Sequence, residues 1–84
     1  MKKNILVIAK NNKVEALRVA VGLVLLSDPV KVDVLGKLEV SPQVREQLEV
    51  LNFADVPCEI LEDRSSLFDK LAQDLISSNV VYII

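Results

Sequence analysis

The chain of 84 residues contains no histidine and no tryptophan, and its one cysteine is Cys58. Zinc sites draw mainly on cysteine and histidine, so we expect no metal site within one chain. A Ser-His-Asp or Cys-His arrangement and an intrachain disulfide are excluded for the same reason. We assign no cofactor, and the residues leave open whether the chain is an enzyme.

Aromatic side chains and positive charge are also scarce. Two Phe and one Tyr are the only aromatic residues, and the net charge is −2. Proteins that bind nucleic acid present a basic stripe, often with aromatic residues that stack on bases, so this class is excluded. The basic residues that do occur are concentrated before residue 19, and the remainder of the chain is acidic.

No apolar stretch approaches the ~20 residues of a membrane-spanning helix. The longest run, residues 19–26, lies between Arg18 and Asp28. Near the start, only five apolar residues precede Lys10, which is too few for a signal peptide. We therefore expect no membrane span and a cytoplasmic protein.

Apolar runs alternate with segments of helical periodicity along the whole chain. Four strands are predicted over residues 4–9, 30–35, 58–61 and 80–84, and three helices over 13–26, 42–51 and about 64–76. Asn12 and Ser41 are placed to cap the first two helices, with Pro42 at the first helical position of the second.

The alternating order predicts one domain, residues 1–84, of the α/β class. We expect a three-layer fold with a four-stranded parallel sheet and helices on both faces, comparable to a flavodoxin-like half. The first and last strands are the most apolar and are expected in the centre. Residues 30–35 (VKVDVL) alternate apolar and polar side chains, which favours an edge strand.

The run VAVGLVLL at residues 19–26 gives the second half of the first helix no polar face. Large exposed apolar patches mark interfaces, so we expect a homo-oligomer, or a hetero-oligomer with related subunits. The expected interface residues on this helix are Val19, Val21, Gly22 and Leu25. The alternative is an inner helix that the chain covers by itself.

Several segments resemble the small DsrE/DsrF-like proteins, a family related to sulfur relay. They are the opening strand at residues 3–8, the helix ALRVAVGLVLL followed by the strand VKVDVLG, the segment LNFADVPCEIL and the closing LISSNVVYII. The resemblance spans nearly the whole chain. It implies an α/β domain that forms oligomers, and in some members a cysteine that carries sulfur as a persulfide.

The resemblance leaves two alternatives, a sulfur-relay protein or a structural subunit of such a complex. If the chain is active, Cys58 is the one residue that could inherit the sulfur-carrying role. The activity needs a thiol with a lowered pKa and some exposure. Glu59 beside it has the wrong charge for this. The alternative is that Cys58 is a small buried apolar residue, as free cysteines commonly are.

A second candidate site follows from the strand ends, which gather loops at one rim of a parallel sheet. Lys10, Asn12, Lys37 and Arg64 fall in these loops and could bind a small anion or a nucleotide. The alternatives are a solvated loop rim and an assembly protein without chemistry. The first loop has no glycine, so it cannot wrap a phosphate as a glycine-rich loop does.

Overall fold

The computed structural model describes residues 3–25, 28–62 and 64–84. Its elements, in chain order, are β1 (Ile5–Ala9), α1 (Lys13–Val24), β2 (Val30–Leu35), α2 (Pro42–Phe53), β3 (Cys58–Leu61), α3 (Arg64–Ser77) and β4 (Val80–Ile83).

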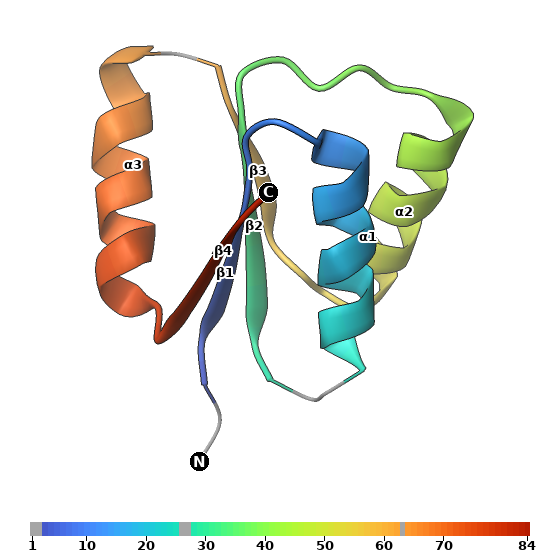
Figure 1. Cartoon of the computed structure of the whole chain (residues 1–84), viewed down its shortest axis with the longest axis horizontal. Coiled ribbons are helices and arrows are strands. Elements are labelled where there is room, and N and C mark those ends of the chain that lie inside the picture. Colours follow the sequence, from blue (N-terminus) through green and yellow to red (C-terminus); the bar gives the residue numbers. More distant parts are fainter. Residues whose placement is uncertain (1–2, 26–27, 63) are drawn as a thin grey trace.

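The three-layer α/β fold expected from the sequence is confirmed. All strand pairs are parallel, α1 and α2 pack on one face of the sheet, and α3 lies on the other (Figure 1). The main core fills the space between the sheet and the α1–α2 layer. Its buried residues are Ile5, Val7, Ala9, Ala16, Leu17, Ala20, Val30, Val32, Val34, Leu38, Val44 and Leu51.

The strand order is β3-β2-β1-β4. Within the expected architecture, β3 therefore lies outside β2, whereas in a flavodoxin-like order it would lie beside β1. This is the order of the first four strands of dinucleotide-binding sheets, in which the chain direction across the sheet reverses between β1 and β4.

The position within the sheet that the sequence predicted was right for β1 and wrong for β2 and β4. β4 is an edge strand although it is apolar, and β2 is central although it alternates. The polar residues of β2, Lys31 and Asp33, lie beneath α3 instead of facing water, and Asp33 is fully buried. Alternation in β2 thus marks a polar contact inside the protein, which a sequence pattern cannot distinguish from exposure to solvent.

Side-chain caps fix the starts of the first two helices as the sequence predicted. Asn12 Oδ1 accepts the backbone N–H of Glu15 at 3.2 Å, and Ser41 Oγ accepts that of Val44 at 3.1 Å. Each cap satisfies a backbone donor that has no partner within its helix. Helix α1 ends at Val24, two residues before the expected end, and Leu26 lies outside the described residues.

The chain itself covers much of the apolar run on α1. Ala20 is buried, and Val21, Leu23 and Val24 pack partly against the core. Gly22 and Leu25 are exposed, and no atom lies within 4 Å of the position that a Cβ on Gly22 would occupy. Four of the eight residues of the run therefore contribute to the core of the chain itself.

Within the described part of the chain, no helix is long and apolar enough to cross a membrane.

Candidate functional site

Cys58 opens β3 and pairs with Val32 of β2, which lies in the main core. The side chain is half-buried and packs partly against this core. Burial, together with the negative charge of Asp33, raises the pKa of the Cys58 thiol. These surroundings favour the neutral thiol, whereas a sulfur carrier needs the thiolate.

The position of Cys58 also separates it from the loops of the carboxyl rim. It begins its strand, so it lies toward the amino ends of the strands, while ligands of open parallel sheets bind beyond the carboxyl ends. Cys58 and the four predicted anion ligands therefore do not form one site.

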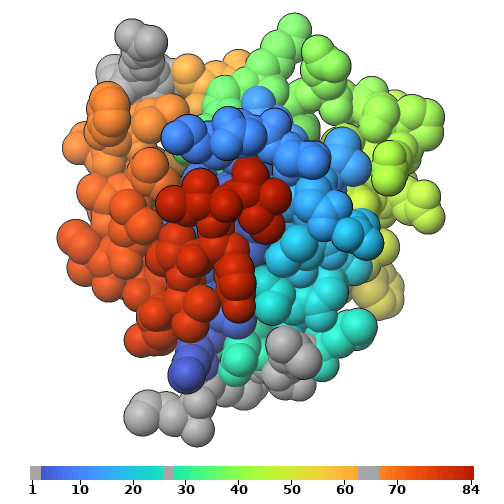
Figure 2. Space-filling view, in the orientation of Figure 1, coloured from blue at the N-terminus to red at the C-terminus, as the bar shows by residue number. Residues whose placement is uncertain are grey.

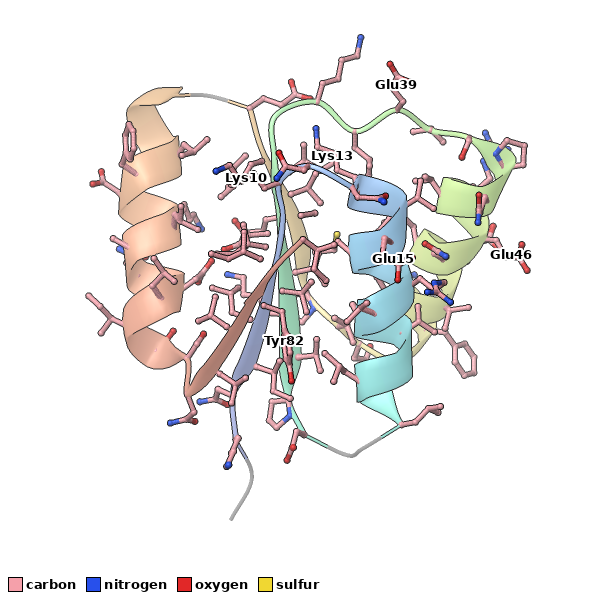
Figure 3. All side chains as sticks on the ribbon, in the orientation of Figure 1. Lys10, Lys13, Glu15, Glu39, Glu46 and Tyr82 are labelled. Carbon is pink, nitrogen blue, oxygen red and sulfur yellow. The ribbon has the colours of Figure 1, made fainter. Side chains whose placement is uncertain are left out.

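Of the four predicted anion ligands, Lys37 lines a hollow at the carboxyl rim. This shallow hollow is lined by Asn11, Lys13, Val14, Lys37, Leu38, Glu39 and Val44. Lys37 belongs to it, whereas Lys10 and Asn12 do not line it. The side chain of Arg64 lies outside the described part of the structure. Figure 3 shows Lys10, Lys13 and Glu39 on this upper side of the molecule.

The polar groups at this rim are engaged with the protein itself. Asn12 caps α1, and Lys13 Nζ donates to the carbonyl oxygen of Lys37 at 2.8 Å. The backbone N–H groups of Lys10 and Asn11 both donate to the carbonyl oxygen of Ile84, at 2.8 and 3.0 Å. Donors that would face a phosphate between β1 and β4 are thus already bonded to the end of β4.

Gly36 shapes the same rim. Its φ of +84° lies in the left-handed region, which residues with a Cβ seldom adopt, and it directs the chain from β2 into the loop before α2. A Cβ at this position would lie 3.7 Å from Lys13 Nζ. This glycine therefore serves the turn that carries Lys37.

A second polar group lies between the sheet and α3, and the sequence analysis missed it. We call it the α3-face cluster; its members are Lys31, Asp33, Glu59, Lys70 and Asp74. Lys31 Nζ lies 2.9 Å from Asp74 Oδ1 and 3.2 Å from Glu59 Oε1, and Lys70 Nζ lies 3.5 Å from Glu59 Oε2.

Asp33 is the buried centre of this cluster. It has no exposed surface, and neither of its carboxyl oxygens has a hydrogen-bond donor among the described residues. Burial, helped by the neighbouring carboxyl of Asp74, raises the pKa of Asp33 to about 7. Near neutral pH this side chain is therefore partly protonated, and its proton can bridge the two carboxyl groups.

The pKa of Asp74 shifts in the opposite direction. Burial by itself raises its pKa, but hydrogen bonds with Asp33 and Lys31 outweigh that effect, so the pKa of Asp74 falls below its ordinary value. The ammonium group of Lys31 has a raised pKa, because Asp74 stabilises its charge. The cluster thus holds an ion pair beside a carboxyl group that burial keeps protonated.

The signal for this cluster in the sequence was weak. Lys31 and Asp33 stand two residues apart on β2, so they share a face of the sheet. Their partners come from β3 and α3, more than 25 residues further along the chain. Among the described residues no group of three or more His, Cys, Asp or Glu is placed to hold a metal ion.

A further feature of the molecule is an apolar surface on the side of β4. The strand lies at the sheet edge between α1 and α3, in the middle of the face shown in Figure 2. Its residues Val81, Tyr82 and Ile83 are all exposed. Helix α3 adds the exposed residues Phe68 and Leu75.

The flanks of the helices determine which residues adjoin β4. On α3, Lys70 and Asp74 contact β3 and β2, so Phe68 and Leu75 lie on the flank toward β4, whereas Ile76 points away from the sheet. On α1, Val21 lines a hollow with residues of α2, which leaves Val19 and Leu23 on the flank toward β4. We call this surface the β4 band; its residues are Val19, Leu23, Phe68, Leu75, Val81, Tyr82 and Ile83.

Comparison with known proteins finds no matching family model, no matching curated protein and no matching solved structure.

Proposed function

We propose that this chain is a small assembly subunit of the DsrE/DsrF-like type, which forms a homo-oligomer and performs no chemistry of its own. The observation that carries the proposal is the β4 band, an apolar surface that spans all three layers of the fold. Exposed apolar patches of this kind are typical of interfaces. The cytoplasmic location expected from the sequence stays a prediction.

The band contains strongly exposed apolar side chains. Phe68 is 72% exposed, Ile83 63% and Leu75 42%. No charged residue occurs from residue 75 to residue 84, although the chain as a whole carries 22 charged side chains. An interface between identical chains benefits from this, because like charges would otherwise face one another.

Sedimentation velocity at high micromolar concentration tests the proposal. We expect a mass that is a multiple of the 9.3 kDa chain. Phe68→Lys should dissociate the oligomer without unfolding it, because the new ammonium group would have to leave water only in the assembly. Phe53→Lys is the matched control, since Phe53 is 92% exposed at the end of α2 and lies outside the band.

The outcomes separate the alternatives. A monomeric wild-type chain would contradict an assembly role. Dissociation by Leu25→Lys but not by Phe68→Lys would place the interface on the outer face of α1, as the sequence pattern predicted. In the structure Leu25 is 82% exposed at the end of α1, and Val21 faces α2.

The sulfur-relay alternative would place a persulfide on Cys58. The raised pKa and the half-buried position of this thiol support the assembly role over the relay. Incubation with a sulfur donor followed by mass spectrometry decides between them. A stoichiometric mass increase of one sulfur atom on Cys58 would favour the relay.

The anion-binding alternative rests on Lys10, Asn12, Lys37 and Arg64. Its test is a thermal shift with phosphate, sulfate and nucleotides, repeated with Lys37→Ala. Stabilisation of the wild-type chain that the variant loses would support a ligand at this rim. The bond from Lys13 to the Lys37 carbonyl and the nearby Glu39 weigh against it.

A further inference from the structure

The two edge strands of the sheet differ in how they meet solvent. β3 is preceded by Pro57, contains Glu59 and is followed by Glu62. Proline and charged residues are the features that keep natural edge strands from pairing with other chains. β4 has neither, and its sequence VVYI is well suited to a sheet. Of the two edges, β4 is therefore the one open to a further strand.

The hydrogen bonds to β1 determine which backbone groups of β4 point outward. The N–H groups of Val80 and Ile84 donate to Asn4 and Ile8 of the β1 side, and the Ile84 carbonyl accepts from Lys10. In a parallel pair alternate residues bond to the same neighbour, so Tyr82 also faces β1. Val81 and Ile83 thus direct their N–H and C=O groups away from the sheet.

These outward groups are complementary to a second copy of themselves. When two β4 strands run antiparallel about a two-fold axis at Tyr82, Val81 of each lies opposite Ile83 of the other. Each such pair exchanges two N–H···O bonds, so four bonds form across the axis. The two Tyr82 residues then form the central pair that has no hydrogen bonds between its backbones.

The flanking layers fit the same axis. A two-fold through the β4 edge brings the two α3 flanks, each with Phe68 and Leu75, together on one side of the sheet. On the other side it brings together the α1 flanks with Val19 and Leu23, beside Tyr82, which lies between β4 and α1 in the view of Figure 3. Every layer of the β4 band thus meets the corresponding layer of the second copy.

The area that a stable dimer needs is a small part of the accessible surface of this chain. A standard interface buries about 800 Å² on each partner. This is about a seventh of the 5646 Å² of accessible surface on the chain. The molecule measures 34 × 33 × 19 Å, and β4 lies in the middle of the broad 34 × 33 Å face (Figure 2).

We propose that a second copy of this chain docks antiparallel on β4, with Tyr82 at the two-fold axis, and forms one continuous eight-stranded sheet. The inference rests on the proposed assembly function and specifies its partner and its register.

Disulfide formation between copies tests the register. In a Cys58→Ser background, Tyr82→Cys places two cysteines in the central pair, where Cα atoms are about 4.5 Å apart and a disulfide can form. We expect the dimer to become covalently linked under mild oxidation. Val81→Cys in the same background is the control, because its Cα atoms in the two copies are further apart than the ~7 Å limit for a disulfide.

A second variant does not depend on oxidation. Val81→Pro removes an outward N–H group and leaves the bonds to β1 in place, so the monomer should remain folded by circular dichroism while the dimer is lost. The register is overturned if the oligomer persists in this variant or if Tyr82→Cys gives no covalent dimer. A wild-type chain that is monomeric overturns both this inference and the assembly function. An oligomer that persists in Val81→Pro overturns this inference alone, so the two failures are distinguishable.

Discussion

The carboxyl group of Asp33 on β2 is buried against that of Asp74 on α3, and the pKa of Asp33 is raised while that of Asp74 is lowered. Lys31 lies on the Asp74 side of this pair, 2.9 Å from its Oδ1 atom. Asp74 therefore keeps its negative charge, and Asp33 holds a proton up to a pH of about 7. This contact joins α3 to the sheet through polar groups.

The Asp33–Asp74 pair predicts a pH dependence of stability. Because the pKa of Asp33 is about 7 in the folded chain and near 3.8 when unfolded, the folded state holds an extra proton between these values. The free energy of unfolding should therefore fall as the pH rises from about 4 to 7, by up to ~1.4 kcal/mol per pH unit for this one proton. Urea unfolding at pH 5, 6, 7 and 8 measures the slope.

The matched variant for this prediction is Asp33→Asn, which keeps the shape and cannot ionise. It should be more stable than the wild-type chain at pH 8, and the difference should shrink toward pH 5. Asp69→Asn, which alters an exposed carboxylate of α3, should retain the wild-type slope. Equal slopes in the wild type and Asp33→Asn would contradict the assigned protonation.

Lys31 and Asp74 should show a measurable coupling free energy. Both are partly shielded from solvent, with side-chain exposures of 29% and 11%. A double-mutant cycle with Lys31→Met and Asp74→Asn should give a coupling of about 1–2 kcal/mol. The exposed pair formed by Glu15 and Arg18 on α1 is the control and should couple more weakly, because water screens it. A larger coupling free energy for Glu15 and Arg18 than for Lys31 and Asp74 would refute the structural role of the α3-face cluster.

Asn12 should contribute to stability through its cap rather than through a ligand. Asn12→Ala should lower the free energy of unfolding by about 1 kcal/mol, since Glu15 N–H loses its acceptor. Asn12→Asp should restore most of the loss. Asn11→Ala, one residue earlier and exposed, should change stability by less than about 0.5 kcal/mol. A phosphate-dependent difference between wild type and Asn12→Ala would instead support the anion site.

Cys58 should react slowly with an alkylating reagent. Its half-buried position and raised pKa both lower the concentration of accessible thiolate. At pH 8 we expect alkylation well below the rate of the same chain in urea, where the thiol is exposed. Mass spectrometry measures the rate of alkylation in each condition. Equal rates would show a reactive thiol and support the relay alternative.

Gly22 distinguishes the two possible interfaces. Nothing in the chain occupies the space near its absent Cβ, so Gly22→Ala should raise the free energy of unfolding by about 0.5–1 kcal/mol. Assembly through the β4 band should be unaffected. If the oligomer weakens while the monomer becomes more stable, another backbone approaches α1 at this glycine.

Local patterns in the sequence were sufficient for the elements and their caps. Residues 4–9 predict a strand because a short continuous apolar run fits a strand buried on both faces, and β1 is such a strand. Asn12, Ser41 and Pro42 mark helix starts because the interactions that define a cap lie within four residues. Regular alternation of these elements then requires a parallel sheet with helical crossovers.

Only the tertiary structure decided the order of the strands and the surroundings of each polar residue. Which face each crossover helix covers determines that β4 is at the edge and β2 in the centre, and this choice is not encoded in the periodicity of either strand. Asp33 and Asp74 are 41 residues apart in sequence, so their contact exists only once α3 packs on the sheet. The apolar character of β4 was visible in the sequence, but its meaning as an open edge depends on where the fold places that strand.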